Sequence, residues 1–456
     1  MPFTKYLFFA LILFSSIITA QVKSETVRVI GDSLVGKVIN GESVREVFGN
    51  VVLTQGNVVI TCDMAVQYIS GNNARLTGNV VARQDSLTIT TSEGFYFGNE
   101  KKTKSISGIT LDDQKVILKA DSGEYFFNED RAFFQTNVVL YDTVTTLYSD
   151  KLTYFQKEDR TVALSNVKIV DKTNEITADT LEHFRKTKIS FADGNVKIRS
   201  LENNTSIFGD HLEDYPQRKN TLINENPLLM QLDTTYTSDG ERRIDTLIIK
   251  ARMMEAFRDT SNIFKAVDSV RILRGEFASV NDFTLYLRSL DLIITEKVNE
   301  ESAQPVLWYE NSQLTGDSVT IYIENKKIKQ LDVVTNSFML AQNEKYNDRF
   351  DQTSSEDIKL FFNDNKIQRA EFLESVLSIY YLYEEGEPNG LTKSSARDAT
   401  ILFEANEVNQ VRLYGTPTSE YHPENQVVGK EKAFTLPKFK FYQNRPEKNV
   451  LLEGTQ

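Results

Sequence analysis

Apolar positions in the first half of the chain recur at a fixed interval of 29 residues. The clearest column is aromatic and consists of Tyr68, Phe97, Phe126, Phe155 and Phe184, with Tyr215 following after 31 residues. A repeat of this length predicts stacked structural units, none of which can bury its apolar face alone. We therefore expect an elongated all-β assembly in which these rings form an interior ladder that joins successive units.

Each unit shows the alternation of a β-strand with one inward and one outward face. A second column with the same interval contains Asn50, Asn79, Asn137, Asn166 and Asn195, with Gly108 in the remaining place. Gly, Ser or Thr precedes each of these, which suits a turn. The positions one and three residues after the column are aliphatic or small. We expect the following to line the interior: Val51, Leu53, Val80, Leu111, Val138, Leu140, Val167, Ile169, Val196 and Ile198.

A second strand is predicted about ten residues later in each unit, with a small residue that is usually followed by Asp. The acidic column contains Asp63, Asp121, Asp150, Asp179 and Asp210, with Ser92 in one place. Repeated Asp on a β-stack is compatible with Ca²⁺ ligands or glycosidase carboxylates. No second acid recurs at a fixed offset, however. We interpret each Asp as hydrogen-bonding its own turn at a strand end, and we expect no metal site.

The pattern continues less regularly towards the far end. Three pairs keep the five-residue step from Asp to an aromatic ring, although the units lengthen to 40 and 41 residues: Asp317 with Tyr322, Asp357 with Phe362, and Asp398 with Phe403. We expect a regular β-region over 21–232 and a second, irregular one over 233–425. A basic tail over 426–456 is either solvated and partly disordered or in contact with anionic headgroups or a partner.

The first 20 residues have the features of a secretory signal peptide. Lys5 precedes a short apolar run over 6–14, and the small residues Thr19 and Ala20 suit cleavage near Ala20. The alternative is an uncleaved anchor, for which the run is short. No other segment approaches the 18 apolar residues of a membrane span, so the mature chain is expected to be soluble.

Composition adds two constraints. The net charge of −12 argues against a nucleic-acid partner. The single cysteine, Cys62, excludes an internal disulfide and stands in the column of small residues, so we expect it to be a packed small side chain.

Catalytic motifs are missing from the sequence. Its three histidines, His183, His211 and His422, occupy unrelated positions, and no metalloprotease, serine-hydrolase or phosphate-loop motif occurs. We therefore expect no enzymatic activity and no cofactor. A parallel β-helix enzyme would show clustered carboxylates. An outer-membrane barrel would not place lysines such as Lys119 and Lys168 at outward positions, and a propeller blade needs some four strands.

Units that begin with Gly-Asn-Val-Val, as at 49–52 and 78–81, and continue with Asp-x-x-x-x-aromatic carry a family resemblance over residues 27–232. The chain resembles the OstA-like family, which includes periplasmic lipopolysaccharide-transport proteins. Segments 305–309, 314–317 and 378–381 are similar to longer members from Gram-negative bacteria. The resemblance implies a twisted β-jelly roll, open at both ends, whose interior takes the acyl chains of lipopolysaccharide. It also implies that members join end to end into a bridge between the two membranes.

We therefore expect a periplasmic carrier that moves lipopolysaccharide from the inner to the outer membrane, possessing an apolar groove lined by the aromatic and aliphatic columns. The resemblance implies inner-membrane and outer-membrane transport components as partners, end-to-end self-association, and association with the outer membrane. The alternative is a structural or scaffold β-rod of the cell envelope that carries no lipid.

Overall fold

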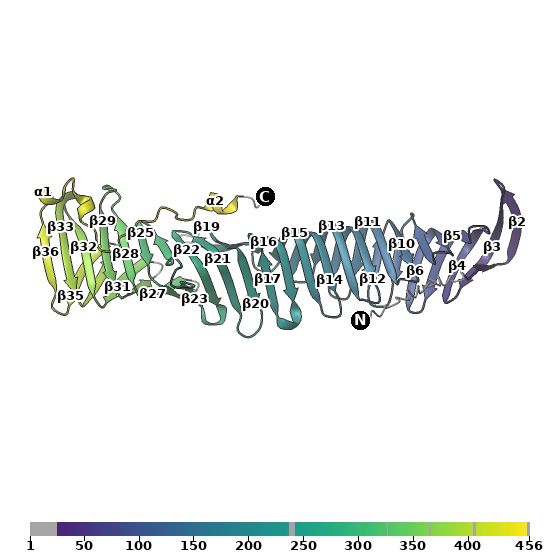
Figure 1. Ribbon diagram of the computed structural model, residues 1–456, viewed down its shortest axis with the longest axis horizontal. Helices are drawn as coiled ribbons and strands as arrows, with labels where there is room; N and C mark the ends of the chain where they lie inside the picture. The colour runs from purple at the N-terminus through teal and green to yellow at the C-terminus, as the bar shows by residue number, and fades with distance from the viewer. Residues whose placement is uncertain (1–24, 237–241, 326, 364–365, 405–406, 454–456) are drawn as a thin grey trace, which may run out of the picture. The chain divides into compact units, whose positions relative to one another are not determined.

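The computed structural model describes residues 25–453 except 237–241, 326, 364–365 and 405–406. The predicted signal peptide, 1–20, lies outside the described residues. The all-β prediction is confirmed, because the described chain consists almost wholly of antiparallel strands (Figure 1). These strands form two compact units, one comprising residues up to 114 together with 122–130, and the other 115–121 together with 131–456.

The first unit contains nine strands. Their bounds are Arg28–Ile30 (β1), Ser33–Ile39 (β2), Glu42–Gln55 (β3), Val58–Tyr68 (β4), Asn73–Gln84 (β5), Leu87–Phe97 (β6), Lys102–Ser105 (β7), Ile109–Asp112 (β8) and Ser122–Phe126 (β10).

The second unit contains the remaining elements. Its strands are Ile117–Ala120 (β9), Arg131–Tyr141 (β11), Thr146–Phe155 (β12), Arg160–Val170 (β13), Asn174–Phe184 (β14), Ile189–Ser200 (β15), Thr205–Tyr215 (β16), Asn220–Asn224 (β17), Leu228–Tyr236 (β18), Arg242–Lys250 (β19), Met253–Phe257 (β20), Ile263–Arg274 (β21), Phe277–Leu287 (β22), Leu292–Glu296 (β23), Val306–Tyr309 (β24), Ser312–Thr315 (β25), Ser318–Glu324 (β26), Lys327–Val334 (β27), Ser337–Gln342 (β28), Phe350–Ser355 (β29), Asp357–Asn363 (β30), Lys366–Leu373 (β31), Val376–Glu384 (β32), Glu387–Ala396 (β33), Asp398–Glu404 (β34), Glu407–Tyr414 (β35) and Thr418–His422 (β36). The short helices are Pro216–Arg218 (η1), Arg288–Leu290 (η2), Glu424–Val427 (α1), Glu431–Ala433 (η3) and Lys448–Leu452 (α2).

Most of the 29-residue repeats are a pair of long strands that bend sharply at mid-length. In the repeat over 102–126 each long strand is replaced by two short ones, β7 with β8 and β9 with β10. In β11 the bend lies at Thr136 and Asn137, which both have a positive φ (65° and 51°). Opposite it, the pairing register with β12 shifts between Gln135 and Val138, as it does at a β-bulge. Asn is among the few non-glycine residues that tolerate the left-handed region, which explains its fixed column.

The Asp column clamps these bends. Asn137 donates from Nδ2 to Asp121 Oδ2 at 2.7 Å. The same bond joins Asn50 to Asp32, Asn79 to Asp63, Asn166 to Asp150 and Asn195 to Asp179, at 2.7 to 2.9 Å. The prediction that each Asp bonds its own turn is therefore wrong: its partner is the Asn that follows 16 to 18 residues later, across the strand pair. In the repeat where Ser92 replaces Asp, Gly108 replaces Asn and the hydroxyls of Ser92 and Ser107 lie 3.2 Å apart.

Asn137→Ala is expected to lower the free energy of unfolding by about 2 kcal/mol. Alanine tolerates a positive φ less well than asparagine does, and the substitution also removes a charge-assisted hydrogen bond. Asn137→Gly, which loses only the bond, should cost about half as much. Chemical denaturation of the two variants measures the difference, and an alanine variant no less stable than the glycine variant would exclude backbone strain at this bend.

The aromatic column does not face the interior, and the prediction of an interior ladder is wrong. Phe155 is partly exposed, and the guanidinium of Arg160 lies 3.9 Å from its ring centre. The preceding residue, Tyr154, is buried at 1% exposure. The same holds at the other repeats, where Tyr68, Phe97, Phe126, Phe184 and Tyr215 are all partly exposed. The bend is the physical reason. Ser149 and Leu152 lie on either side of it and are both buried, although they are three positions apart. The alternation of inward and outward residues is therefore reversed after the bend, and Phe155 points outward.

The interior column is one residue earlier than predicted. It contains Gln67, Tyr96, Tyr125 and Tyr154, all buried, and the half-buried His183. The aliphatic columns do point inward: Val51, Leu53, Val80, Leu111, Val138, Leu140, Val167 and Val196 are buried, and Ile169 and Ile198 are partly buried. Cys62 is buried among them, as expected, and burial raises the pKa of its thiol to about 11.

The basic tail is ordered against the second unit, although its lysines are exposed. Residues 423–453, hereafter the strap, leave β36 and run back along the second unit until α2 reaches β19 (Figure 1). Leu436 and Leu451 of the strap are buried, and Leu451 packs with Leu228 and Ile248. The expectation of a disordered end is therefore wrong for the described part of the tail, because its apolar residues find a matching surface.

Candidate functional site

Beyond β22 the long bent strands give way to short strands in two sheets. One sheet runs β23–β26–β27–β30–β31–β34–β35, and the other runs β24–β25–β28–β29–β32–β33–β36. Inward side chains of both sheets meet in a single apolar cluster. This part of the chain is therefore a sandwich whose interior lies between two sheets that both branch from β22.

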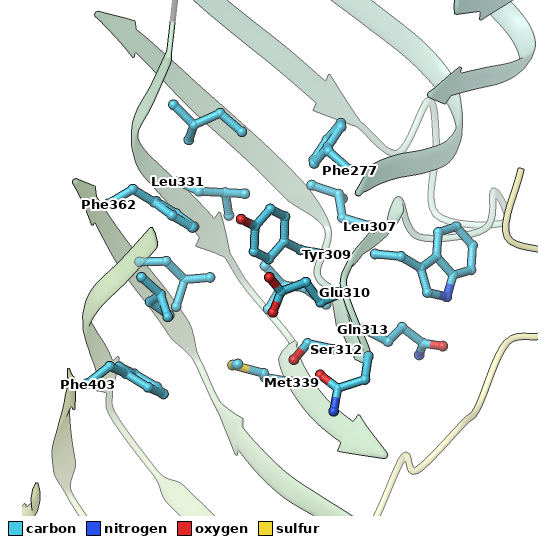
Figure 2. A pocket seen from close by; sticks show the side chains of 16 residues that line it. Phe277, Leu307, Tyr309, Glu310, Ser312, Gln313, Leu331, Met339, Phe362 and Phe403 are labelled. Carbon is cyan, nitrogen blue, oxygen red and sulfur yellow. The ribbon is translucent and has the colours of Figure 1, made fainter. Parts of the chain in front are cut away.

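A small apolar pocket with a cavity volume of about 110 Å³ lies within this cluster and is partly open to solvent. Both sheets contribute to its walls, as Figure 2 shows. The main apolar residues are Phe277, Leu307, Leu314 and Met339 from one side and Ile328, Leu331, Leu360, Phe362, Ile367 and Phe403 from the other. Its lining is thus hydrocarbon on both sides.

The mouth of the pocket is formed by the turn between β24 and β25. Glu310 and Asn311 of this turn are exposed and also line the pocket, so they mark its open side. Just inside, the ring of Tyr309 meets that of Phe362 edge to face, with centroids 6.2 Å apart. This contact joins the two sheets at the mouth and narrows the opening.

The chemistry of the pocket suits an uncharged, flexible ligand. Burial raises the pKa of Tyr309, so its hydroxyl is neutral at physiological pH. Glu310 is the only charged residue of the lining, and it stands at the exposed turn. Among the described residues there is no cluster of His, Cys, Asp or Glu that could hold a metal ion. A pocket of this kind binds through burial of apolar surface.

A second hollow, at the bend of β21, is polar. Arg252 stands where the regular repeats have Asp, and it contacts Asp268 at 3.3 Å. The bend is thus clamped by an Arg–Asp ion pair in place of the Asn–Asp hydrogen bond of the regular repeats. Lys250, Arg271 and Glu225 also line this hollow, so it carries both positive and negative side chains.

The sequence pattern pointed to only part of the pocket. Phe362 and Phe403 were singled out by their spacing from Asp357 and Asp398, and both line the pocket. Tyr322, at the equivalent position, is instead exposed. The residues from the first half of the chain that were predicted to line a groove lie elsewhere: the aliphatic ones are in the packed interior of the regular repeats, and the aromatic ones are on the partly exposed outer face. Their role as a lipid-contacting surface stays a prediction.

Sequence reasoning missed Phe277, Leu331 and Met339. Leu331 does belong to an alternating strand pattern, together with Val333. Nothing in that pattern shows that the two sheets separate here, because separation depends on which strands pair, and pairing partners are distant in the sequence.

The fold and the pocket define the class of protein: a β-stack of repeated strand pairs with an apolar interior. Residues 29–179 and 116–208 match the OstA-like protein family. This region of the chain is therefore similar to the OstA-like family, in agreement with the resemblance found in the sequence.

Comparison with solved structures gives a match to LptH from Pseudomonas aeruginosa, described as the LptA-homologous periplasmic component of the conserved lipopolysaccharide transport device. The two chains are 15% identical, the match covers 37% of this chain and 83% of LptH, and the TM-score is 0.11. A comparison with curated proteins finds no match. Among the described residues, no helix has the length and apolar character needed to span a membrane.

Proposed function

We propose that this protein is a periplasmic, non-enzymatic carrier of lipopolysaccharide that shields acyl chains on their way from the inner to the outer membrane. The observation that carries the proposal is the apolar pocket between the two C-terminal sheets. The similarity of residues 29–208 to the OstA-like family supports the same cargo class, since that resemblance implies lipopolysaccharide transport.

The energetics favour such a carrier. Each buried methylene contributes roughly 0.8 kcal/mol, so a chain of about a dozen carbons costs on the order of 10 kcal/mol to expose to water. Contacts within the pocket come from aliphatic and aromatic side chains on both sides. Such contacts carry little directionality, which lets a lipid enter and leave without breaking specific bonds.

The N-terminal end supports the proposed contact with other transport components. Strand β2 pairs with β3, and it is exposed along its whole length. Its exposed apolar residues include Leu34, Val35 and Val38. An exposed apolar edge strand is a template for strand addition by an inner-membrane partner or a second copy of the chain.

The second candidate function is a structural β-rod without cargo. It is favoured by the close packing of the regular repeats, where the buried rings of Tyr96, Tyr125 and Tyr154 fill the interior. Mass spectrometry of lipid that co-purifies with the mature protein separates the two functions, because a rod carries none.

Site-specific photo-crosslinking in cells tests the carrier. A photoreactive phenylalanine analogue at Phe362 or Phe403 should capture lipopolysaccharide, because both rings line the pocket. The matched control is Tyr322, which stands at the same five-residue step after an Asp but is exposed. Capture of equal amounts at Tyr322 and Phe403 would refute the proposed pocket.

A further inference from the structure

The strap lies on the face of the second sheet that is turned away from the pocket. In β24, Leu307 belongs to the apolar cluster around the pocket, while the next residue, Trp308, contacts the pocket only from its border and packs in a different cluster with Tyr442 of the strap. In β28, Phe338 likewise contacts Phe439 of the strap, with ring centres 6.5 Å apart. The sheet that walls the pocket is therefore covered by the strap on its other side.

Two buried glutamines hold the strap as a neighbouring strand would. Gln313 donates from Nε2 to the carbonyl of Lys440 at 2.9 Å, and its Oε1 accepts from the N–H of Tyr442 at 2.8 Å. Gln352 repeats this arrangement with the carbonyl of Phe434 and the N–H of Leu436, at 3.1 and 2.9 Å. Each amide thus pairs with residues n and n+2 of an extended chain, which fixes the strap's register.

Further along, Arg445 connects the strap to the mouth of the pocket. Its guanidinium donates to the backbone carbonyls of Glu310 and Glu276, each at 2.7 Å. These carbonyls belong to two adjacent turns, one between β24 and β25 and the other between β21 and β22, and the strands β22 and β24 pair with Phe277 opposite Tyr309. One side chain therefore fastens both turns.

The two turns carry side chains of the mouth. Phe277 follows Glu276 and Tyr309 precedes Glu310, and both rings line the pocket. Because Tyr309 contacts Phe362 of the opposite sheet, fixing the turn also fixes the narrowing between the sheets. Both Glu276 and Glu310 are exposed, so water can replace Arg445 at their carbonyls and the fold does not depend on these bonds.

We propose that the strap is a latch on the acyl-chain pocket and that Arg445 is the positioning residue that holds the mouth narrowed around its ligand. The inference rests on the proposed function of the pocket and adds a control over how fast the ligand leaves. With the latch seated, Tyr309 and Phe362 retain a bound chain, and when Arg445 is released the turns separate and the chain exchanges.

The test uses the full mature chain and cis-parinaric acid, a single-chain fluorescent fatty acid. Its dissociation is measured by competition for the wild type, for Arg445→Met and for Lys448→Met, an exposed strap cation. Dissociation from Arg445→Met should be about tenfold faster, because a charge-assisted hydrogen bond contributes on that order to a barrier. Lys448→Met should behave as the wild type. Equal rates for all three proteins would overturn the latch.

Two further measurements separate the possible failures. Trp308 is the only tryptophan and is buried beneath the strap, so its emission reports whether the strap is seated. We expect unchanged emission in Arg445→Met, and a red shift would assign faster release to loss of the whole strap, contradicting a local role of Arg445.

Amide hydrogen exchange at 309–312 should accelerate in Arg445→Met without any ligand, and unchanged exchange would also overturn the latch. Failure of the wild type to bind the probe would instead overturn the lipid role of the pocket.

Discussion

Tyr154→Ala is expected to lower the free energy of unfolding of the second unit by about 3 to 5 kcal/mol, because it removes a large ring from a packed interior. Tyr154 is 1% exposed. Each repeat packs on its neighbours, so a cavity here also weakens the coupling of the repeats on either side. Chemical denaturation, followed by a backbone signal, measures the loss.

The matched control is the next residue. Phe155→Ala removes a ring of similar size from the opposite face, where the ring is partly exposed and lies against Arg160. We expect a loss of about 1 kcal/mol, made up of a cation–π contact and partial burial. If Phe155→Ala were the more damaging of the two, the assignment of inner and outer faces would be reversed.

Arg349→Met should cost about 3 to 5 kcal/mol near neutral pH, because it leaves two carboxylates without their buried partner. The guanidinium binds Glu424 through both oxygens, at 2.6 and 3.1 Å, and reaches Glu431 at 3.3 Å. The side chain of Arg349 is 4% exposed. These contacts fasten α1 and η3, so the variant should also loosen the start of the strap, with a red shift of Trp308 emission.

The cost of this substitution should depend on pH. The hydrogen bonds that Glu424 accepts from Arg349 hold the pKa of the Glu424 carboxyl below the usual 4.5. A carboxyl group with a lowered pKa contributes its full stabilisation when the pH is above its pKa in the unfolded chain. This contribution is lost as the pH falls through its pKa in the folded protein. The difference between wild type and Arg349→Met should therefore be full at pH 7 and shrink below about pH 4. Arg397→Met, which breaks an exposed pair with Asp398, should cost less than about 1 kcal/mol at either pH.

The sequence predicted the strands through local rules and failed where a bend intervenes. Val138 and Leu140 were placed inward correctly, because both follow the bend directly and simple alternation applies to them. Phe155 was placed on the wrong face. It lies six positions after the inward Ser149, so simple alternation predicts an inward ring, but the bend between the two residues reverses the alternation. The positive φ that Thr136 and Asn137 share was hinted at only by the choice of residue types.

The pocket could be predicted only in fragments. The spacing of Phe362 and Phe403 marked them as repeat positions, and the same spacing marked Tyr322, which is exposed. The pairings of β26 with β27, β30 with β31 and β34 with β35 all contain a one-residue register shift, and Tyr322 stands just before its shift whereas Phe362 and Phe403 stand just after theirs. The site therefore depends on register shifts that the spacing of residue types does not record.

The sequence by itself determined the repeat, the strand content, the aliphatic interior and the similarity of residues 29–208 to the OstA-like family, because each of these follows from residue types at fixed local intervals. Only the tertiary structure decided which aromatic column is buried, which acid clamps which bend, where two sheets part to leave a pocket, and that the basic tail is a strap. Gln313 and Arg445 illustrate the reason: their partners lie 127 to 169 residues away in the chain. Contacts of that range arise from packing, which no local pattern of hydrophobic and polar residues specifies.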